Sequence, residues 1–149
     1  MNNRKVYISG EIVPEADAKI SIFDSAVLLG DTVTESTRTF NYKPFKLDDH
    51  LERLYKSFKL TRIDPQMTIE EMKKVSLDLL EINKDNYKAN EDCWLVHNIS
   101  RGHSITGGNP ALQVSKPTVM IYTQPMNLVL WAPFYTKGCH AVTPPTRMV

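Results

Sequence analysis

The chain has 149 residues, which is enough for one globular domain and at most a fragment of a second. Hydrophobic residues make up 42% and charged residues 23% of it, so the disordered and fibrous classes are excluded. Eighteen Lys and Arg against 17 Asp and Glu leave a net charge of +1, which argues against nucleic acid or an acidic membrane as a partner. No apolar run reaches the roughly 20 residues of a membrane span, and the first residues lack a signal-peptide core. We therefore expect a cytoplasmic protein.

The first third of the sequence predicts strands. Val6–Pro14 contains two short strand patterns joined at Gly10, which indicates a hairpin. Ala18–Ile22 alternates apolar and polar residues and predicts a strand with one buried face. Thr32–Phe40 is rich in β-branched residues and predicts a longer strand, which the turn at Asn41–Pro44 ends.

Two helices follow. Asp48 or Asp49 can cap the first. One face of that helix carries four apolar residues, Leu51, Leu54, Tyr55 and Phe58. Thr68 and Glu71 form a capping box at the start of the second, whose apolar positions are Met72, Val75, Leu79 and Leu80. A polar turn at Asn83–Asn90 ends it.

The remaining elements complete an α+β domain over residues 1–123. Cys93–Ser100 predicts a strand, Arg101–Pro110 a glycine-rich loop, and Pro117–Thr123 a strand buried on both faces. Six of the nine prolines lie in the last 40 residues. We therefore expect an interdomain linker at residues 124–127 and the beginning of a second domain at 128–149, with about two short strands and too few residues for a core of its own.

Two polar groups suggest chemistry without further context. His50 and Arg53 are three residues apart and lie on one side of their helix. An arginine there can bind a phosphate with its fork of donors, although spacing alone favours a surface ion pair with Glu52, Asp49 or Asp48. Glu35 either faces solvent or points inward and holds a buried polar network.

Other candidate sites are weak. His140 adjoins Cys139, but an adjacent pair is more often packing than metal ligation, so we expect no metal. Cys93 has no paired base and fits a buried structural thiol. Gly107–Gly108 can cradle a phosphate or simply form a tight turn.

Three stretches in order along the chain carry a more specific signal. Ala18–Asp24, Gly30–Asp31 and Glu35–Arg38 form a block of the pattern isv.D…GD.v.E..R. Phe45–Ser57 has the pattern f.l..H..RL..S, and Trp94–Pro110 is a strand followed by a glycine-rich loop ending in Asn-Pro. Together they resemble the N-terminal domain of the fold-type IV pyridoxal-phosphate enzymes, the class IV aminotransferases, a family that includes the D-amino acid and branched-chain aminotransferases.

The resemblance implies roles for individual residues. Arg53 falls on the arginine that binds the phosphate of pyridoxal 5'-phosphate, which reverses the expectation from spacing, and His50 would help to position the helix. Thr34, Trp94 and Val96 fall on residues that line the substrate pocket.

The resemblance also implies a homodimer, because the family's site lies at a subunit interface. Leu29 and the loop around Gly108 would reach the pocket of the neighbouring subunit. The substrate would be an amino acid or amine together with a 2-oxo acid.

Several departures bear on the substrate. Thr34 stands where many members have an aromatic residue, and Val96 stands where bacterial branched-chain enzymes have an arginine. Thr106 and Gly108 replace the carboxylate-binding Arg and His of the D-amino acid enzymes. A branched-chain substrate is our first expectation, with D-amino acids, (R)-amines and an aminodeoxychorismate lyase-like activity left open.

No lysine of this chain falls on the family's Schiff-base position, which belongs to the second domain beyond Val149. We therefore expect residues 1–149 to be the N-terminal part of a longer aminotransferase, with no catalytic residue of its own and no activity in isolation. The alternatives are a non-catalytic domain of the same fold that serves as an interaction module, and an unrelated α+β binding domain.

Overall fold

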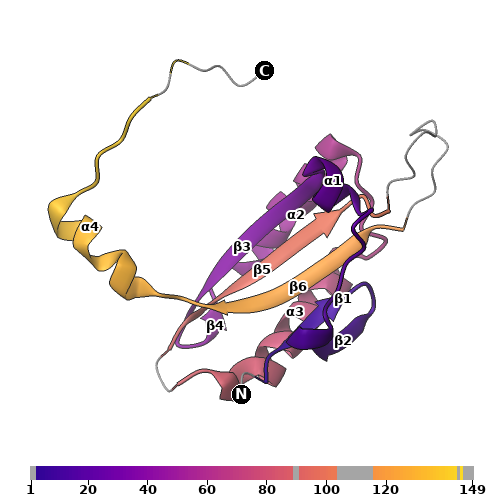
Figure 1. The fold of residues 1–149 in the computed structure, drawn as a ribbon. Coiled ribbons are helices and arrows are strands. Elements are labelled where there is room, and N and C mark those ends of the chain that lie inside the picture. The colour runs from indigo at the N-terminus through magenta and orange to yellow at the C-terminus, as the bar shows by residue number, and fades with distance from the viewer. Residues whose placement is uncertain (1–2, 89–90, 104–115, 144, 146–149) are drawn as a thin grey trace.

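A computed structural model describes residues 3–88, 91–103, 116–143 and 145 of the chain. Its centre is a six-stranded antiparallel sheet with the strand order β2-β1-β6-β5-β3-β4 (Figure 1). The strands are β1 (Lys5–Ile8), β2 (Glu11–Pro14), β3 (Thr32–Phe40), β4 (Lys43–Pro44), β5 (Cys93–Ser100) and β6 (Thr118–Pro125).

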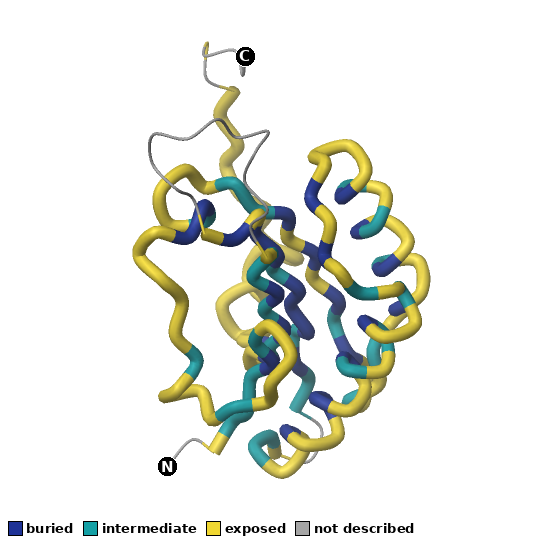
Figure 2. Tube along the Cα trace, turned by 90° about the vertical axis from the view of Figure 1, so that its right-hand side faces the viewer, coloured by how far each residue is buried: buried dark blue, intermediate teal, exposed yellow. Residues whose placement is uncertain are grey.

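Helices cover one face of this sheet. The α-helices are α1 (Ser25–Leu29), α2 (Leu47–Thr61), α3 (Ile69–Asn83) and α4 (Ala132–Lys137), and short 3-10 turns occupy Glu15–Asp17, Lys84–Asn86 and Leu128–Leu130. The long helices α2 and α3 pack side by side on the sheet, and the buried residues gather between them and the strands (Figure 2). The opposite face, which we call the open face, has no such helical layer in the described part of the chain.

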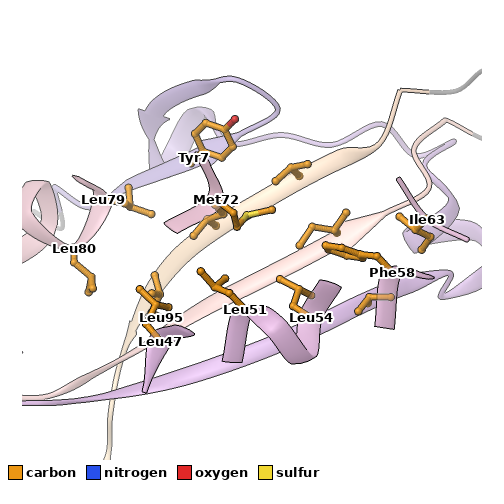
Figure 3. Packing of buried hydrophobic residues seen from close by; sticks show 14 of the residues in the cluster. Tyr7, Leu47, Leu51, Leu54, Phe58, Ile63, Met72, Leu79, Leu80 and Leu95 are labelled. Carbon is orange, nitrogen blue, oxygen red and sulfur yellow. The ribbon is translucent and has the colours of Figure 1, made fainter. Parts of the chain in front are cut away.

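The hydrophobic core lies between α2, α3 and the sheet (Figure 3). Leu51, Leu54 and Phe58 recur at helical spacing along α2 and meet Met72 and Leu79 of α3. The central strands add Leu95, Ile99 and Ile121, all fully buried. Burying one such side chain contributes about 1.5–3 kcal/mol, so this single layer accounts for most of the stability that the fold can obtain from apolar burial.

Much of the predicted secondary structure is confirmed. The hairpin at Gly10 forms, and β3 and β5 have the predicted bounds. Thr68 and Glu71 form the capping box of α3. The α+β class with two main helices on an antiparallel sheet is therefore confirmed.

The predicted start of the first helix is wrong. The helix begins at Leu47, and Asp48 and Asp49 lie inside its first turn rather than at the cap. The capping position belongs to Lys46, which has a left-handed backbone and gives no side-chain cap. The two carboxylates still favour this end of the helix, because negative charge in the first turn interacts well with the helix dipole.

Two predicted strand features are also wrong. Ala18–Ile22 is irregular, and Ile22 is 70% exposed, because no strand of the described residues pairs with this segment. The apolar residues before Gly30, for which no helix was predicted, form α1, capped by Asp24. The last strand, β6, is buried on one face only, since Val119 and Ile121 face the helices while Met120 and Tyr122 face the open side.

The region after the sheet differs from expectation as well. β6 continues to Pro125, so Gln124 and Pro125 of the expected linker belong to the sheet. Where two short strands were expected, the described residues 128–143 form a 3-10 turn and α4, which extends away from the sheet, and contain no strand (Figure 1). The described residues of 128–143 are all exposed, in agreement with a segment too short for its own core. The division into two domains stays a prediction.

A polar group lies inside the core at His97. This histidine of β5 is fully buried, and its Nε2 lies 2.7 Å from the hydroxyl of Ser76 on α3. Because Ser76 donates its own hydrogen to the carbonyl of Met72, His97 Nε2–H must be the donor. Its Nδ1 has no hydrogen-bond partner among the described residues. Burial lowers the pKa of His97 from 6.5 to about 4, so the ring is neutral at pH 7.

This buried histidine predicts an acid-sensitive fold. Since the unfolded chain binds a proton at His97 below pH 6.5 and the folded chain does so only near pH 4, the free energy of unfolding falls as pH drops through that window, by up to about 3 kcal/mol. His97→Gln should flatten this slope between pH 6.5 and 4.5 in urea unfolding, whereas His140→Gln, at an exposed position, should leave it unchanged. An unchanged slope in His97→Gln would contradict the assignment.

Candidate functional site

Glu35 is the centre of a polar cluster between β3 and α2. Its side chain is only 6% exposed. Arg53 donates to it through both Nε, at 2.6 Å from Oε2, and Nη2, which contacts Oε1. His50 Nδ1 lies 2.8 Å from the same Oε1 and donates its proton there. The three-residue spacing on α2 places both donors over one carboxylate, as the helical repeat requires.

The charges of this cluster stabilise one another. Burial by itself would raise the pKa of Glu35, but the hydrogen bonds from Arg53, His50 and the Ser36 amide outweigh it and hold that pKa below its ordinary value of 4.5. The carboxylate in turn raises the pKa of Arg53. At pH 7 the cluster therefore contains an ionised Glu35 held by the guanidinium of Arg53 and the ring of His50.

The cluster lies at a free edge of the sheet. Among the described residues, β4 pairs only with Thr39 and Phe40 of β3, so the earlier part of that strand has no neighbour on its outer side. The Ser36 amide, which does not bond to β5, donates to Glu35 Oε1 at 3.0 Å. Arg53 is consequently fixed by a buried partner while 65% of its own side chain remains exposed at this edge.

These contacts decide two alternatives that the sequence leaves open. Glu35 points inward and holds a polar network, rather than facing solvent. The surface ion pair of Arg53 with Glu52, Asp49 or Asp48, which spacing alone favours, is wrong. These three acids pair with lysines instead, in the combinations Lys73–Asp48, Lys46–Asp49 and Lys56–Glu52.

Three predicted substrate residues share the open face. Thr34 on β3 is exposed there, and Trp94 and Val96 on β5 lie on the same side, since their sequence neighbours Leu95 and His97 are buried against the helices. In the strand register, Thr34 pairs with Asn98 and Ser36 pairs with Val96.

Arg53 approaches from the other side of β3. It lies with α2 on the helical side, and the free edge of β3 separates it from Thr34. A ligand that meets both must therefore lie at this edge. Val96 offers little surface of its own, because it is only 6% exposed among larger neighbours such as Trp94 and Tyr122.

Leu29 occupies a different place from the other predicted residues. It ends α1 and is 73% exposed. The buried carboxylate of Asp24 holds this helix, accepting from the Ala26 amide at 2.9 Å and from the Thr118 hydroxyl at 2.6 Å. Gly108 lies outside the described residues.

Sequence reasoning missed several side chains of the open face. Ser36, Asn98 and Tyr122 stand beside the predicted residues in the register of the three central strands. Strict alternation along each strand would have found them once the strand order was known. That order depends on long-range pairing, which no local pattern specifies.

Arg53 is well suited to bind an anionic cofactor. The guanidinium of Arg53 uses Nε and Nη2 on Glu35, and its Nη1 has no hydrogen bond within that part of the chain, so donors remain for a phosphate. No set of three or more His, Cys, Asp or Glu side chains in the described ranges gathers as a metal site would require. None of the helices in these ranges is both long and apolar enough to cross a bilayer.

Comparison with solved structures defines the class of protein. Branched-chain amino acid aminotransferase from Escherichia coli superposes with a TM-score of 0.72 at 25% identity, covering 83% of this chain and 41% of that one. The branched-chain aminotransferase of Thermoproteus uzoniensis, solved with norvaline, gives a TM-score of 0.70 at 24% identity, with coverage of 83% and 41%. A further branched-chain enzyme, solved with pyridoxamine 5'-phosphate, also gives 0.70 at 24% identity. The sheet and its two helices therefore have the fold of the N-terminal part of branched-chain aminotransferases.

Sequence comparison identifies the family. Residues 32–146 match the model of the amino-transferase class IV family, and the chain belongs to that family. A protein of Methanocaldococcus jannaschii with the provisional name of branched-chain-amino-acid aminotransferase is 37% identical over 143 residues, which are 96% of this chain and 46% of that protein. D-alanine aminotransferase of Staphylococcus epidermidis is 32% identical over 120 residues, 80% of this chain and 41% of that protein. The chain thus spans less than half the length of these relatives.

The Glu35 cluster predicts a loss of stability when its charge is removed. Glu35→Gln keeps the shape but leaves Arg53 and His50 without an ionised acceptor, so unfolding at pH 7 should cost about 1–2 kcal/mol less. The difference from the unchanged protein should narrow as pH falls below 4.5, because a carboxylate with a lowered pKa loses its stabilising effect on protonation. Glu52→Gln, an exposed carboxylate on the same helix, is the control in urea unfolding; equal effects of the two variants would contradict the role of Glu35.

Proposed function

We propose that this chain forms the N-terminal half of a site in which pyridoxal 5'-phosphate transfers an amino group between an amino acid or amine and a 2-oxo acid. The observation that carries the proposal is Arg53, held by Glu35 and exposed at the free edge of β3 next to the open face. Membership of the class IV family, which depends on pyridoxal phosphate, supports the choice of cofactor.

In this proposal Arg53 anchors the cofactor phosphate. A guanidinium fixed by a buried carboxylate loses little side-chain entropy when it binds a second anion, so Glu35 and His50 orient it in advance. Thr34 and Trp94 face the substrate from the open side. When bound, the cofactor supplies the electron sink that allows an amino group to leave one carbon and join another.

We propose that the lysine amine that holds the cofactor lies outside residues 1–149. No lysine of this chain matches the family's motif position, and the relatives are more than twice as long as the part that matches. We propose that a further segment of the protein supplies this lysine and closes over the open face. Residues 1–149 alone should then not transaminate. The names of the relatives make branched-chain amino acids the first substrate candidate and D-alanine the second.

Cofactor binding to the whole protein tests the role of Arg53. Arg53→Gln should weaken pyridoxal phosphate by about 10-fold to 100-fold, because a charge-assisted phosphate contact is lost. It should leave the affinity for pyridoxal, which has no phosphate, unchanged. Lys56→Gln, which removes an exposed cation further along α2, is the control, and affinities are read by isothermal titration.

The outcomes separate the alternatives. Loss of phosphate-dependent binding in Arg53→Gln alone supports the proposal. Equal binding of pyridoxal phosphate by both variants would contradict it. Phosphate-dependent binding without any imine absorbance would instead support a non-catalytic binding domain of the same fold.

The second copy of a homodimer is also part of the proposal. The outer surface around α1 carries five exposed apolar side chains, Ile22, Phe23, Val27, Leu28 and Leu29. An exposed apolar patch of this kind marks an association surface. The patch includes Leu29, for which the family resemblance implies contact with the neighbouring subunit.

Leu29→Asp should convert the dimer to a monomer, since a charge in a desolvated interface is costly. The measurement is sedimentation equilibrium of the whole protein. Ile82→Asp is a matched control, because Ile82 is 48% exposed near the end of α3. The next residue, Asn83, contacts Lys5 and Thr123, at the opposite end of β6 from Thr118, which contacts Asp24 beside the patch. A dimer that persists in Leu29→Asp, or a monomer in the unchanged protein, would contradict this assembly.

A further inference from the structure

The side chains on the open face of the three central strands form two regular rows, which we call the wall. Register places Thr34 of β3, Asn98 of β5 and Met120 of β6 in one row across the sheet. The next row contains Ser36, Val96 and Tyr122. Adjacent rows on one face of a sheet lie within reach of a single small ligand.

Hydrogen-bonding groups dominate this wall. Thr34 and Ser36 contribute hydroxyls, Asn98 an amide and Tyr122 a phenol. The Asn98 carbonyl oxygen contacts the Thr32 hydroxyl, and its amide nitrogen has no hydrogen-bond partner among the described residues. The Tyr122 hydroxyl likewise has no hydrogen bond within those residues, and it borders a cavity of about 320 Å³ over β6 and β1.

The six residues of these two rows carry no charge. Charged groups lie beside them: Arg4, Lys5 and Glu15 line the cavity next to Tyr122, and Arg4 is paired with Glu15 at 2.9 Å. Arg38 stands in the row beyond Ser36, where its guanidinium lies 3.8 Å over the ring of Phe40 and 3.8 Å from the carboxylate of Asp92. Of the two apolar members, Val96 is almost covered and Met120 is half-buried. A ligand over these rows therefore meets the neutral hydroxyl, amide and phenol groups beside the apolar side chain of Met120.

Excluding water from the wall determines which substrate side chains can bind there. Once substrate and protein exclude water, each polar group left unpaired costs about 1–3 kcal/mol. An aliphatic side chain pairs with none of these groups, whereas a hydroxyl or carboxamide pairs with them. A site built to hydrogen-bond a substrate strongly rejects an isostere that lacks the polar atoms. An apolar site rejects an isostere with an added polar atom less strongly.

We propose that Asn98 and Tyr122 are specificity-determining residues and that the substrate is an amino acid whose side chain carries a neutral hydroxyl or carboxamide. This inference rests on the proposed aminotransferase function and narrows its substrate class. It departs from the branched-chain substrate that the relatives' names suggest.

Two pairs of near-isosteric donors test it in the whole protein: asparagine with leucine, and threonine with valine. Each amino acid is assayed as both enantiomers, and the readout is the ratio of kcat/KM within each pair. The unchanged protein should favour the polar member by about 10-fold or more. Asn98→Leu should lower the asparagine-to-leucine ratio at least about 10-fold, and Tyr122→Phe, which removes one oxygen only, should lower one or both ratios severalfold.

Asn86→Leu is the matched control. This asparagine is half-buried like Asn98 but lies beyond the end of α3, away from the open face, so its replacement should leave both ratios unchanged. If Asn98→Leu fails to fold, the kcat/KM ratios of Tyr122→Phe still test the specificity inference.

The two proposals fail in different ways. A preference for leucine and valine, or ratios that neither Asn98→Leu nor Tyr122→Phe changes, would overturn the specificity inference and leave the aminotransferase function intact. Absence of transamination with every donor, despite bound cofactor, would overturn the proposed function and the inference with it.

Discussion

The interaction on which the candidate site depends is the contact of Glu35 with Arg53 and His50. A carboxylate that is 6% exposed is expensive to keep ionised unless donors surround it. Two side chains of α2 and one backbone amide of β3 do so here. The same contacts tie the first turns of α2 to the strand and fix an exposed cation at its edge. The same cluster thus stabilises the fold and orients the exposed guanidinium of Arg53 for a ligand.

The sheet separates two kinds of chemistry. Odd-numbered positions of β3 face α2 and α3, where they meet the apolar core and a few buried polar groups such as His97. Even-numbered positions face the open side and carry the substrate candidates. Because the first part of β3 has no neighbouring strand on its outer side within the described ranges, a ligand at that edge can contact Arg53 from one side and the open face from the other. The alternation of a single strand, with an unpaired edge, is what makes this combination possible.

Local patterns predicted the elements that local physics determines. The β-branched run of β3 and the Thr68 capping box were predicted correctly because propensity and capping act within a few residues. Ala18–Ile22 has the alternation of a strand but no partner strand among the described residues, so the prediction failed where long-range pairing decides. Asp48 is a good capping residue, yet the helix starts earlier because Leu47 is needed in the core.

The candidate site was predictable only in part. The spacing of His50 and Arg53 indicated a shared helix face, but the sequence left open whether Glu35 turns inward, and that decides what Arg53 pairs with. The grouping of Thr34, Trp94 and Val96 followed from family resemblance, and the structure shows them on one face. Asn98 and Tyr122 were missed because strand order and register, rather than sequence spacing, bring them to that wall. The roles of Arg53, Thr34 and Leu29 toward a ligand or a partner stay predictions.

The most direct test of the central claim is the nuclear magnetic resonance signal of the Arg53 Nε–H group, assigned by its loss in Arg53→Lys. If Glu35 holds this guanidinium for a phosphate, the proton should exchange slowly with solvent in the whole protein, exchange fast in Glu35→Gln, and shift on addition of pyridoxal phosphate but not of pyridoxal. Arg62, an exposed arginine at the end of the same helix, is the reference. The account would be contradicted if the Arg53 Nε–H proton exchanged as fast as that of Arg62 and did not shift on addition of pyridoxal phosphate.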